Sequence, residues 1–306
     1  MIEKDYYFKG GHIMNILVLG GTRFFGQKLV ELCLQEGHHV TILTRGQTKH
    51  PFGSNVKQLI VDRNNDEALT QALAHTAWDI VYDNICYSPD EAQVICKVLK
   101  GKTKKLVFTS TLSTYEVDGK IKKEEDFDPF HYPIRMGHRE DFSYGEGKRL
   151  AEAVLFQTAT FPVVAVRFPI IMGEHDYTRR LHFHIEHILH NQPITVSNVD
   201  AQMSYMTDKE AAAFLYFAGM YPIEGPYNAT ANGTISLKEL IALIEQASGK
   251  QAKISLVGGD QASQSPYNIP AHWYMSNTKA TTAGFTFSEL HEWLPKLVTT
   301  LIKQLQ

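Results

Sequence analysis

The chain has 306 residues, of which 43% are hydrophobic, and its 30 basic and 33 acidic residues give a formal net charge of −3. This apolar share is ample for a buried core and excludes a disordered chain. A charge so close to zero creates no global field that would collect nucleic acid, although a local basic groove stays compatible with it. The composition therefore favours an enzyme that acts on a small molecule.

The three cysteines, Cys33, Cys86 and Cys96, lie in apolar segments without the spacing of metal ligands. Such cysteines are typical of small buried side chains in a reducing compartment, so we expect a cytoplasmic protein. No run approaches the ~18 apolar residues of a membrane span, and the N-terminal segment lacks the apolar centre of a signal peptide. The first predicted strand follows Met14, so residues 1–13 are expected to be vector-derived or to reflect an upstream start.

Short apolar segments rich in β-branched residues alternate with helical or loop segments in the first part of the chain. The predicted strands are Asn15–Gly20, His39–Thr44, Val56–Asp62, Trp78–Asn84, Lys104–Ser110 and Val163–Phe168. Strands that are apolar on both faces and separated by helices are typical of a parallel sheet covered on both sides. We therefore expect an α/β fold, a doubly wound parallel sheet of the Rossmann type with a smaller C-terminal substrate lobe.

After Phe168 the sequence becomes richer in proline, histidine and aromatic residues, and two helices are predicted at Asp208–Met220 and Ser236–Gly249. The second helix opens with Ser236 and Glu239, which have the spacing of a capping box, and it closes at a glycine. We expect residues 14–170 to form the dinucleotide-binding domain. Residues 171–306 are expected to form mainly a substrate-binding lobe, with some chain returning to the sheet.

Between the first strand and the first helix, Gly20, Gly21 and Gly26 form the pattern G-G-x-x-x-x-G. Gly20 permits a tight turn, the amides at the helix start attract a pyrophosphate, and Gly26 lets the helix pack closely on the sheet. Glycines are also common at simple strand-to-helix turns. The motif alone therefore leaves a phosphate cradle and a plain turn about equally supported.

The end of the second predicted strand bears on the choice of cofactor. Arg45 stands where a cofactor with a free ribose 2′-hydroxyl is usually held by a carboxylate, and Lys49 is close by. An arginine matches a 2′-phosphate, so NADP is favoured over NAD. Arg23, inside the glycine loop, adds a second positive contact or is a solvated loop residue. Asp62, at the end of the third strand, either accepts from the adenine amino group or caps the following helix.

The candidate chemistry rests on Tyr144 and Lys148, whose spacing of four places them on one face of a helix, one turn apart. A free tyrosine has a pKa near ~10, but a neighbouring ammonium and an oxidised nicotinamide ring both favour the phenolate. The tyrosine then becomes a usable acid and base. Thr111, at the end of the fifth strand, is chosen as the hydroxyl that polarises a carbonyl. Ser110 and Ser113 are the alternatives.

The ordered motifs GGTRFFG, TRG, STLSTY, YGEGK, RFP and a Met-Thr-Asp-Lys-Glu-Ala-Ala helix start resemble the extended or atypical short-chain dehydrogenase/reductases, the NAD-dependent epimerase/dehydratase family. The resemblance spans about Asn15 to Ala231. It implies Tyr144 as acid/base, Lys148 as the residue that bridges the ribose hydroxyls, and Thr111 as a catalytic hydroxyl. It also implies that members commonly act on nucleotide-diphosphate sugars and that many dimerise through helices flanking the sheet.

One departure concerns the glycine loop, where Arg23 replaces the middle glycine of the usual G-x-x-G-x-x-G. The variant GGTRFxG is similar to that of a branch that includes plastid stem-loop RNA-binding proteins. The complete predicted cofactor-binding set is Gly20, Gly21, Thr22, Arg23, Phe24, Phe25, Gly26, Arg45, Asp62, Ile85, Ser110, Tyr144, Lys148, Phe168, Pro169 and Ile171.

Substrate contacts are predicted in the segment Met172–His190 and beyond. Arg179 and Arg180 have the chemistry to clamp a diphosphate but equally suit a solvated surface, and Tyr205 is assigned to the substrate or to the core. The histidines 184, 187 and 190 recur every three residues and drift off one helix face. We therefore expect no metal site.

The leading hypothesis is a nicotinamide-dependent epimerase or reductase acting on a nucleotide-diphosphate sugar or a similar alcohol or ketone, with epimerase or reductase chemistry favoured over dehydration. The alternative is a non-catalytic NADP- or RNA-binding member of the same fold. For this alternative, the basic segment Lys100–Lys105 is the only candidate RNA-binding patch in the sequence. It has no interleaved aromatic residues. A homodimer is compatible with both hypotheses.

Overall fold

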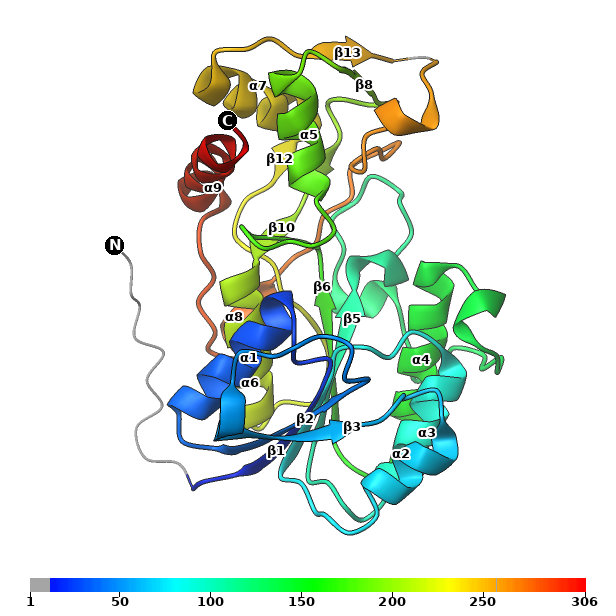
Figure 1. Ribbon diagram of the computed structural model, residues 1–306. Coiled ribbons are helices and arrows are strands. Elements are labelled where there is room, and N and C mark those ends of the chain that lie inside the picture. Colours follow the sequence, from blue (N-terminus) through cyan, green and yellow to red (C-terminus); the bar gives the residue numbers. More distant parts are fainter. Residues whose placement is uncertain (1–11, 257) are drawn as a thin grey trace. The chain divides into compact units, whose positions relative to one another are not determined.

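The computed structural model describes residues 12–256 and 258–306 and divides them into two compact units. Unit 1 contains the chain up to Thr114 together with Phe127–Phe168 and Lys209–Tyr227. Unit 2 contains Tyr115–Asp126, Pro169–Asp208 and Asn228–Gln306. Figure 1 shows the chain coloured along its sequence. The segment 1–13, for which a vector-derived or upstream origin is expected, lies mostly outside the described residues.

Unit 1 is built on a seven-stranded sheet with the order β11-β6-β5-β4-β1-β2-β3. Neighbouring strands from β3 to β6 are all parallel. The predicted doubly wound α/β fold is thereby confirmed. The strands are β1 (Asn15–Leu19), β2 (His39–Thr44), β3 (Val56–Ile60), β4 (Ile80–Asp83), β5 (Leu106–Thr111), β6 (Val163–Phe168) and β11 (Gly225–Asn228).

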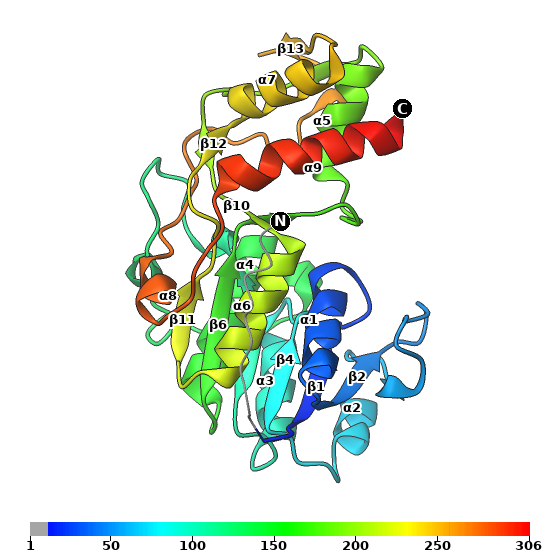
Figure 2. The same ribbon diagram turned by 90° about the vertical axis from the view of Figure 1, so that its left-hand side faces the viewer.

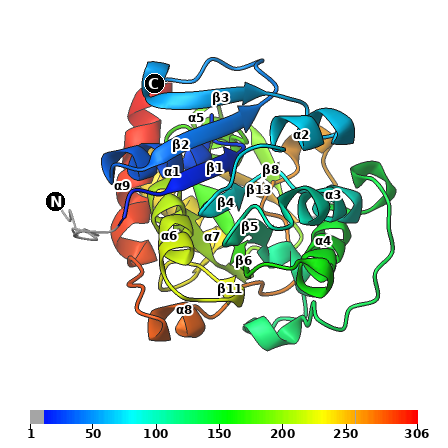
Figure 3. The same ribbon diagram turned by 90° about the horizontal axis from the view of Figure 1, so that it is seen from below.

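Helices cover both faces of this sheet, which explains why its central strands are apolar along their whole length. Viewed from below, α1 and α6 lie on one face and α3 and α4 on the other (Figure 3). All residues of β4, β5 and β6 are buried, whereas the edge strand β3 is partly exposed. The helices are α1 (Phe24–Gln35), α2 (Asp66–Ala72), α3 (Pro89–Leu99), α4 (Tyr144–Thr158) and α6 (Asp208–Met220).

The strand order reverses between β1 and β4, because the chain runs outward from β1 through β2 to β3 and then returns to the other side of β1. In open parallel sheets, ligands bind outside the carboxyl ends of the strands at such a reversal. The loops that follow β1 and β4 are therefore the first place to look for a site.

Unit 2 has its own core, in which the helices α5, α7 and α9 pack together (Figure 2). Helix α7 is bounded as the sequence predicts: Ser236 and Glu239 form a capping box, and Gly249 ends the helix with φ 67°. The helices are α5 (Arg180–Leu189), α7 (Leu237–Ser248), α8 (Thr278–Thr282) and α9 (Leu290–Leu305).

Three strand pairs complete unit 2. Strands β7 and β10 are parallel, β8 and β13 are parallel, and β9 and β12 are antiparallel. Their bounds are β7 (Ile170–Met172), β8 (Pro193–Thr195), β9 (Gln202–Met203), β10 (Tyr205–Thr207), β12 (Ile235–Ser236) and β13 (Lys253–Ser255).

The three cysteines are all buried free thiols, as their apolar sequence context predicts. Burial raises the pKa of Cys86 to about 12, so this thiol is protonated and unreactive at neutral pH. Among the described residues, no helix is both long enough and apolar enough to cross a membrane.

Candidate functional site

The glycine loop forms a tight connection from β1 to α1. Gly20 has φ 81°, a backbone conformation that side-chain-bearing residues rarely adopt. A Cβ on Gly26 would lie 2.3 Å from the carbonyl oxygen of Gly20, and one on Gly20 would lie 2.5 Å from Cγ2 of Ile85. The glycines therefore let α1 start directly against the end of β1 and under the loop that follows β4.

The missing middle glycine has a structural explanation. Arg23 has φ −140° and ψ 151°, which is extended backbone that any residue can adopt. The left-handed conformation falls on its neighbour, Phe24, at φ 52°. For a residue with a large side chain this conformation is strained, and such strain is concentrated at functional sites. The ring of Phe24 lies 5.8 Å from that of Phe25, centroid to centroid.

The start of α1 differs from the starts of four other helices in the described chain. It has no side-chain cap and no acidic residue in its first turn. The helices α2, α3, α4 and α7 are each capped by an asparagine or serine side chain and carry acidic residues in the first turn. The first amides of any helix have no partner within the helix, so the start of α1 fits an anionic group such as a pyrophosphate.

The basic residues near the carboxyl end of β2 lie close to this loop. The guanidinium of Arg23 donates to Oγ1 of Thr48 at 2.8 Å, and Thr48 follows Arg45 by three residues. Both arginines are exposed. The hydrogen bond ties the glycine loop to the β2–β3 connection, which concentrates positive charge at one place.

Asp62 does not cap the helix that follows it. Its Oδ1 accepts from the backbone N–H of Asn64 at 3.0 Å, and Asn65 is the N-cap of α2, with its side chain accepting from the N–H of Ala68. Asp62 itself is exposed. The capping alternative proposed from the sequence is therefore wrong, and a role in adenine binding stays a prediction.

The end of β4 links the glycine loop to β5. The amide of Asn84 donates to the carbonyl of Gly20 at 3.5 Å, and its side-chain oxygen accepts from Oγ1 of Thr109 at 2.7 Å. The predicted cofactor residue Ile85 packs on Gly20. Asn84 did not emerge from sequence reasoning, although it is a polar residue directly after a buried strand.

A buried ion pair fixes the same loop. Arg63 and Asp83 are both buried, and their side chains meet at 2.7 Å. Oδ1 of Asp83 also accepts from the N–H of Ile85 at 3.1 Å. Sequence reasoning missed this pair, although each charge stands at or just beyond the end of an apolar strand.

Lys148 lies almost completely buried beneath this loop, with 1% exposure. Its Nζ donates to the carbonyl oxygens of Cys86 and Thr109, both at 2.7 Å. Burial lowers the pKa of Lys148 to about 8. The ammonium form therefore predominates at neutral pH, and one of its three N–H groups has no acceptor among the described residues.

Tyr144 begins α4 and is 52% exposed, so one turn of helix separates an accessible phenol from a buried ammonium. The two glycines of YGEGK let this turn approach the strand-end loops. A Cβ on Gly145 would lie 2.4 Å from the carbonyl oxygen of Ser113, and one on Gly147 would lie 2.5 Å from that of Tyr87. Sequence reasoning included both glycines in the YGEGK motif but gave them no packing role.

The hydroxyls at the end of β5 point to different partners. Oγ1 of Thr111 accepts from the N–H of Ser113 at 3.1 Å and lies 3.3 Å from its hydroxyl. The hydroxyl of Ser110 instead donates to the carboxylate of Glu152. The side chain of Ser110 is thus part of a structural network. The prediction that Ser110 binds the cofactor is therefore wrong for its hydroxyl group.

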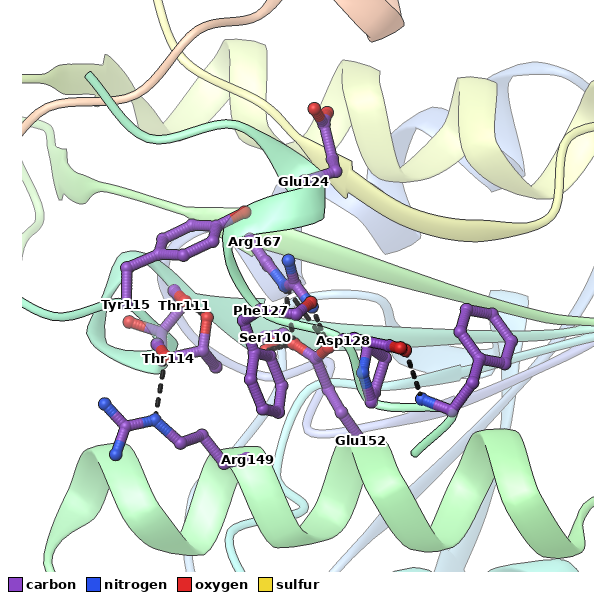
Figure 4. A network of polar contacts seen from close by, with 12 residues as sticks. Ser110, Thr111, Thr114, Tyr115, Glu124, Phe127, Asp128, Arg149, Glu152 and Arg167 are labelled. Atoms are coloured by element: carbon purple, nitrogen blue, oxygen red, sulfur yellow. Dashed lines mark hydrogen bonds and ion pairs between the residues drawn. The ribbon is translucent and has the colours of Figure 1, made fainter. Parts of the chain in front are cut away.

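That network is a fully buried ion pair between α4 and β6 (Figure 4). Arg167 and Glu152 are both 0% exposed, and Nη2 of Arg167 lies 2.6 Å from Oε2 of Glu152. Nη2 also donates to the carbonyl of Phe127 at 3.1 Å. The signal for this pair was present in the sequence, because each residue is the lone charge within an apolar stretch.

The remaining predicted cofactor residues fall in both units. Phe168 ends β6 in unit 1 and packs against Phe25, with ring centroids 6.0 Å apart. Pro169 and Ile171 lie at the start of the Pro169–Asp208 segment of unit 2, where Ile171 pairs with Met206. Their contacts with a cofactor stay predictions.

The predicted substrate residues of unit 2 differ from one another. Arg179 has φ 54° and is paired with Glu186. The guanidinium of Arg180 has no ion-pair or hydrogen-bond partner in the described part of the chain. Tyr205 is 1% exposed and packs against Tyr267 with ring centroids 5.4 Å apart, so its prediction as a substrate residue is wrong and it is a core residue.

His184, His187 and His190 bond to protein groups. His184 is buried, with Nε2 2.8 Å from Oγ of Ser265 and Nδ1 2.9 Å from the carbonyl of Arg180. Burial lowers the pKa of His184 to about 4. His187 and His190 bond to the carbonyls of Pro193 and Glu186.

The strand order, the reversal between β1 and β4 and the glycine loop define a doubly wound fold of the dinucleotide-binding class. Residues 16–84 match the model of the NAD dependent epimerase/dehydratase family, which confirms the family resemblance over that part of the chain.

The chain is 25% identical over 230 residues to a chloroplast stem-loop binding protein of 41 kDa from Arabidopsis thaliana, and the alignment covers 70% of this chain and 57% of the relative. The chain thus spans little more than half the length of that relative.

Two solved structures share the fold. A UDP-glucuronic acid 4-epimerase from Bacillus cereus, in complex with UDP-glucuronic acid and NAD, aligns with a TM-score of 0.74 at 19% identity over 96% of this chain and 100% of the other. A UDP-glucose 4-epimerase from Thermus thermophilus, in complex with NAD, aligns with a TM-score of 0.70 at 19% identity. The alignment covers 95% of this chain and 99% of the other.

Proposed function

We propose that the protein is a nicotinamide-dependent epimerase or reductase that acts on a nucleotide-diphosphate sugar or a similar alcohol or ketone. The observation that carries this proposal is the pairing of an exposed phenol with a buried ammonium on the first turn of α4, held by glycines against the loops after β4 and β5. In this proposal unit 1 binds the dinucleotide and unit 2 binds the substrate.

The glycine loop would hold the pyrophosphate on the uncapped start of α1, and the free N–H of Lys148 would bind a ribose hydroxyl. A bound nicotinamide dinucleotide supplies hydride acceptance and return. The phenolate of Tyr144 takes the proton of the substrate hydroxyl while the carbon releases its hydride, so that an alcohol becomes a carbonyl. Thr111 donates a hydrogen bond to the same oxygen, and the charged Lys148 stabilises the phenolate.

We propose NADP as the preferred cofactor. Arg45 carries the charge and the fork geometry for a 2′-phosphate, and Arg23 is held close to the same connection by Thr48. The solved neighbours named above are complexes with NAD. An Arg45→Ala variant is therefore expected to lose affinity for NADPH and to keep its affinity for NADH.

For the substrate, Arg180 is the better candidate of the two arginines in unit 2, because Arg179 is already paired with Glu186. A guanidinium without a protein partner at a helix start suits a diphosphate. The UDP-glucuronic acid bound in the Bacillus cereus neighbour has this chemistry. The buried free thiols fit a cytoplasmic location, and a homodimer is the assembly that the family resemblance suggests.

The test is a fluorescence titration with NADPH and NADH, followed by a screen of nucleotide-diphosphate sugars. We expect micromolar or tighter dinucleotide binding, and turnover that falls by at least two orders of magnitude in Tyr144→Phe with dinucleotide binding retained. Turnover that survives in this variant would contradict the proposed role of Tyr144.

A second candidate function is RNA binding, which is favoured by the similarity to the chloroplast stem-loop binding protein from Arabidopsis thaliana. The basic segment Lys100–Lys105 is partly committed elsewhere. Lys104 pairs with Asp79 at 2.7 Å, and Lys105 donates to the carbonyls of Ala218 and Tyr221. Tight, salt-dependent binding of a stem-loop RNA by a protein that binds no dinucleotide would place this function first.

A further inference from the structure

Lys148 is a buried cation that has no anion beside it. The described residues offer no carboxylate within ion-pair distance of its Nζ. A buried ammonium without a counterion is costly, and it normally loses its proton. Something other than an ion pair must therefore keep it charged.

Two aromatic faces take that place. The Nζ lies 4.6 Å from the ring centroid of Tyr87 and 4.7 Å from that of Phe108. Both distances are within the range of a cation–π interaction, which is strongest when the cation is shielded from water. Phe108 is a core residue of β5 with 0% exposure. Tyr87 is partly exposed and lies in the loop after β4.

Tyr87 is held in place from several sides. Its N–H donates to the carboxylate of Glu91, and its carbonyl is in close contact with Gly147. The guanidinium carbon of Arg139 lies 4.3 Å from the ring centroid. The ring of Tyr144 is 6.3 Å away, so Tyr87 contacts the surroundings of both members of the proposed catalytic pair.

We propose that Tyr87 is a positioning residue whose ring keeps Lys148 charged and aims its free N–H at the dinucleotide. This inference rests on the proposed function, because that function gives the N–H its target. Neither the sequence pattern nor the family match assigns a role to Tyr87.

Other charged groups also act on Lys148. The carboxylates of Asp83, at the end of β4, and Glu91, on α3, favour its charged form, whereas Arg63 disfavours it. None of these groups is altered by a substitution at Tyr87. A change in the titration of Lys148 on replacing only the ring would therefore report the ring.

The experiment replaces Tyr87 by phenylalanine and by phenylalanine carrying one, two and three ring fluorines. The shape of the ring is nearly constant in this series, while its attraction for a cation falls stepwise. The titration of Lys148 is followed by NMR of the lysine Cε groups in the protein without dinucleotide. The signal is assigned by its loss in Lys148→Met.

We expect Tyr87→Phe to keep the wild-type midpoint and the most fluorinated ring to lower it by about one pH unit, the equivalent of one cation–π contact. Affinity for NADPH at pH 8 should fall in the same order, by up to about tenfold. Tyr87→Leu should resemble the most fluorinated ring, and Tyr87→Trp should raise the midpoint.

A midpoint that is constant across the fluorinated series would overturn the role of Tyr87. A wild-type protein that binds no dinucleotide at any pH would instead overturn the proposed function, and the NMR midpoints would still decide whether the ring sets the charge of Lys148. The two failures are therefore distinguishable.

Discussion

Helix α4 carries two buried ionic sites that are one turn apart and solve the same electrostatic problem differently. In the middle of the helix, Glu152 faces the guanidinium of Arg167, and both side chains have 0% exposure. In the N-terminal part, Lys148 has only two carbonyls and two aromatic faces around it. The first site is neutral as a whole and fully occupied by protein groups. The second has a net charge and an unused N–H, which are properties of a ligand site.

The largest effect should come from breaking the occupied site. Glu152→Leu leaves the guanidinium of Arg167 buried without its anion, and we expect a loss of ~3–5 kcal/mol in the free energy of unfolding. Chemical denaturation measures it. Combining Glu152→Leu with Arg167→Met should recover most of the loss, because a well-packed apolar pair can replace a buried ion pair. A loss under about 1 kcal/mol in the single variant would mean that the pair is not a structural element.

Removing the cation of the second site should act on binding instead. In Lys148→Met we expect NADPH affinity to fall ~10–100-fold, the equivalent of one charged hydrogen bond. The stability at pH 7 should not fall by more than about 1 kcal/mol, since the variant removes an ammonium that has no counterion. Titration and denaturation of the same preparation test both statements. A large loss of stability with unchanged affinity would make Lys148 a structural residue.

The two sites should also differ in their response to pH. The pKa of Lys148 is lowered from 10.5 to about 8, so between these values the unfolded chain binds a proton that the folded chain does not. The stability of the wild type relative to Lys148→Met should therefore rise with pH, by roughly 1–2 kcal/mol from about pH 8 to about pH 9.5. Denaturation curves of both proteins across this interval provide the measurement. A flat difference would show that Lys148 titrates normally.

The smallest effects distinguish the neighbouring hydroxyls of β5. Ser110→Ala removes a donor to Glu152 and should cost about 1 kcal/mol of stability while leaving NADPH binding unchanged. Thr111→Val should leave stability nearly unchanged and reduce turnover by ~10-fold or more. Parallel stability and turnover assays decide this. The opposite result would assign the catalytic hydroxyl to Ser110.

Much of unit 1 could be predicted from the sequence, because local signals and burial agree there. Strands β2 and β6 and helix α6 have the predicted bounds. In unit 2, the capping box of α7 was predicted directly from Ser236 and Glu239. The alternative that Asp62 caps α2 was wrong because α2 begins at Asp66 with Asn65 as its N-cap, and the carboxylate of Asp62 accepts from the N–H of Asn64, before the helix. Of the two alternatives for Tyr205, the core is confirmed and the substrate is wrong; the sequence left both open because aromatic residues suit both a core and a ligand site.

The sequence by itself determined the periodic features: the apolar strands of the sheet, the glycine turn, and a tyrosine and a lysine one helical turn apart. These depend on contacts between residues that are near each other in the chain. Only the tertiary structure decided which partner each buried charged side chain contacts. Arg63 with Asp83, Ser110 with Glu152 and Lys148 with the ring of Tyr87 come from separate segments, and their distances depend on strand order and helix packing. Burial strengthens each of these interactions, because the low-dielectric interior removes the water that would otherwise screen them.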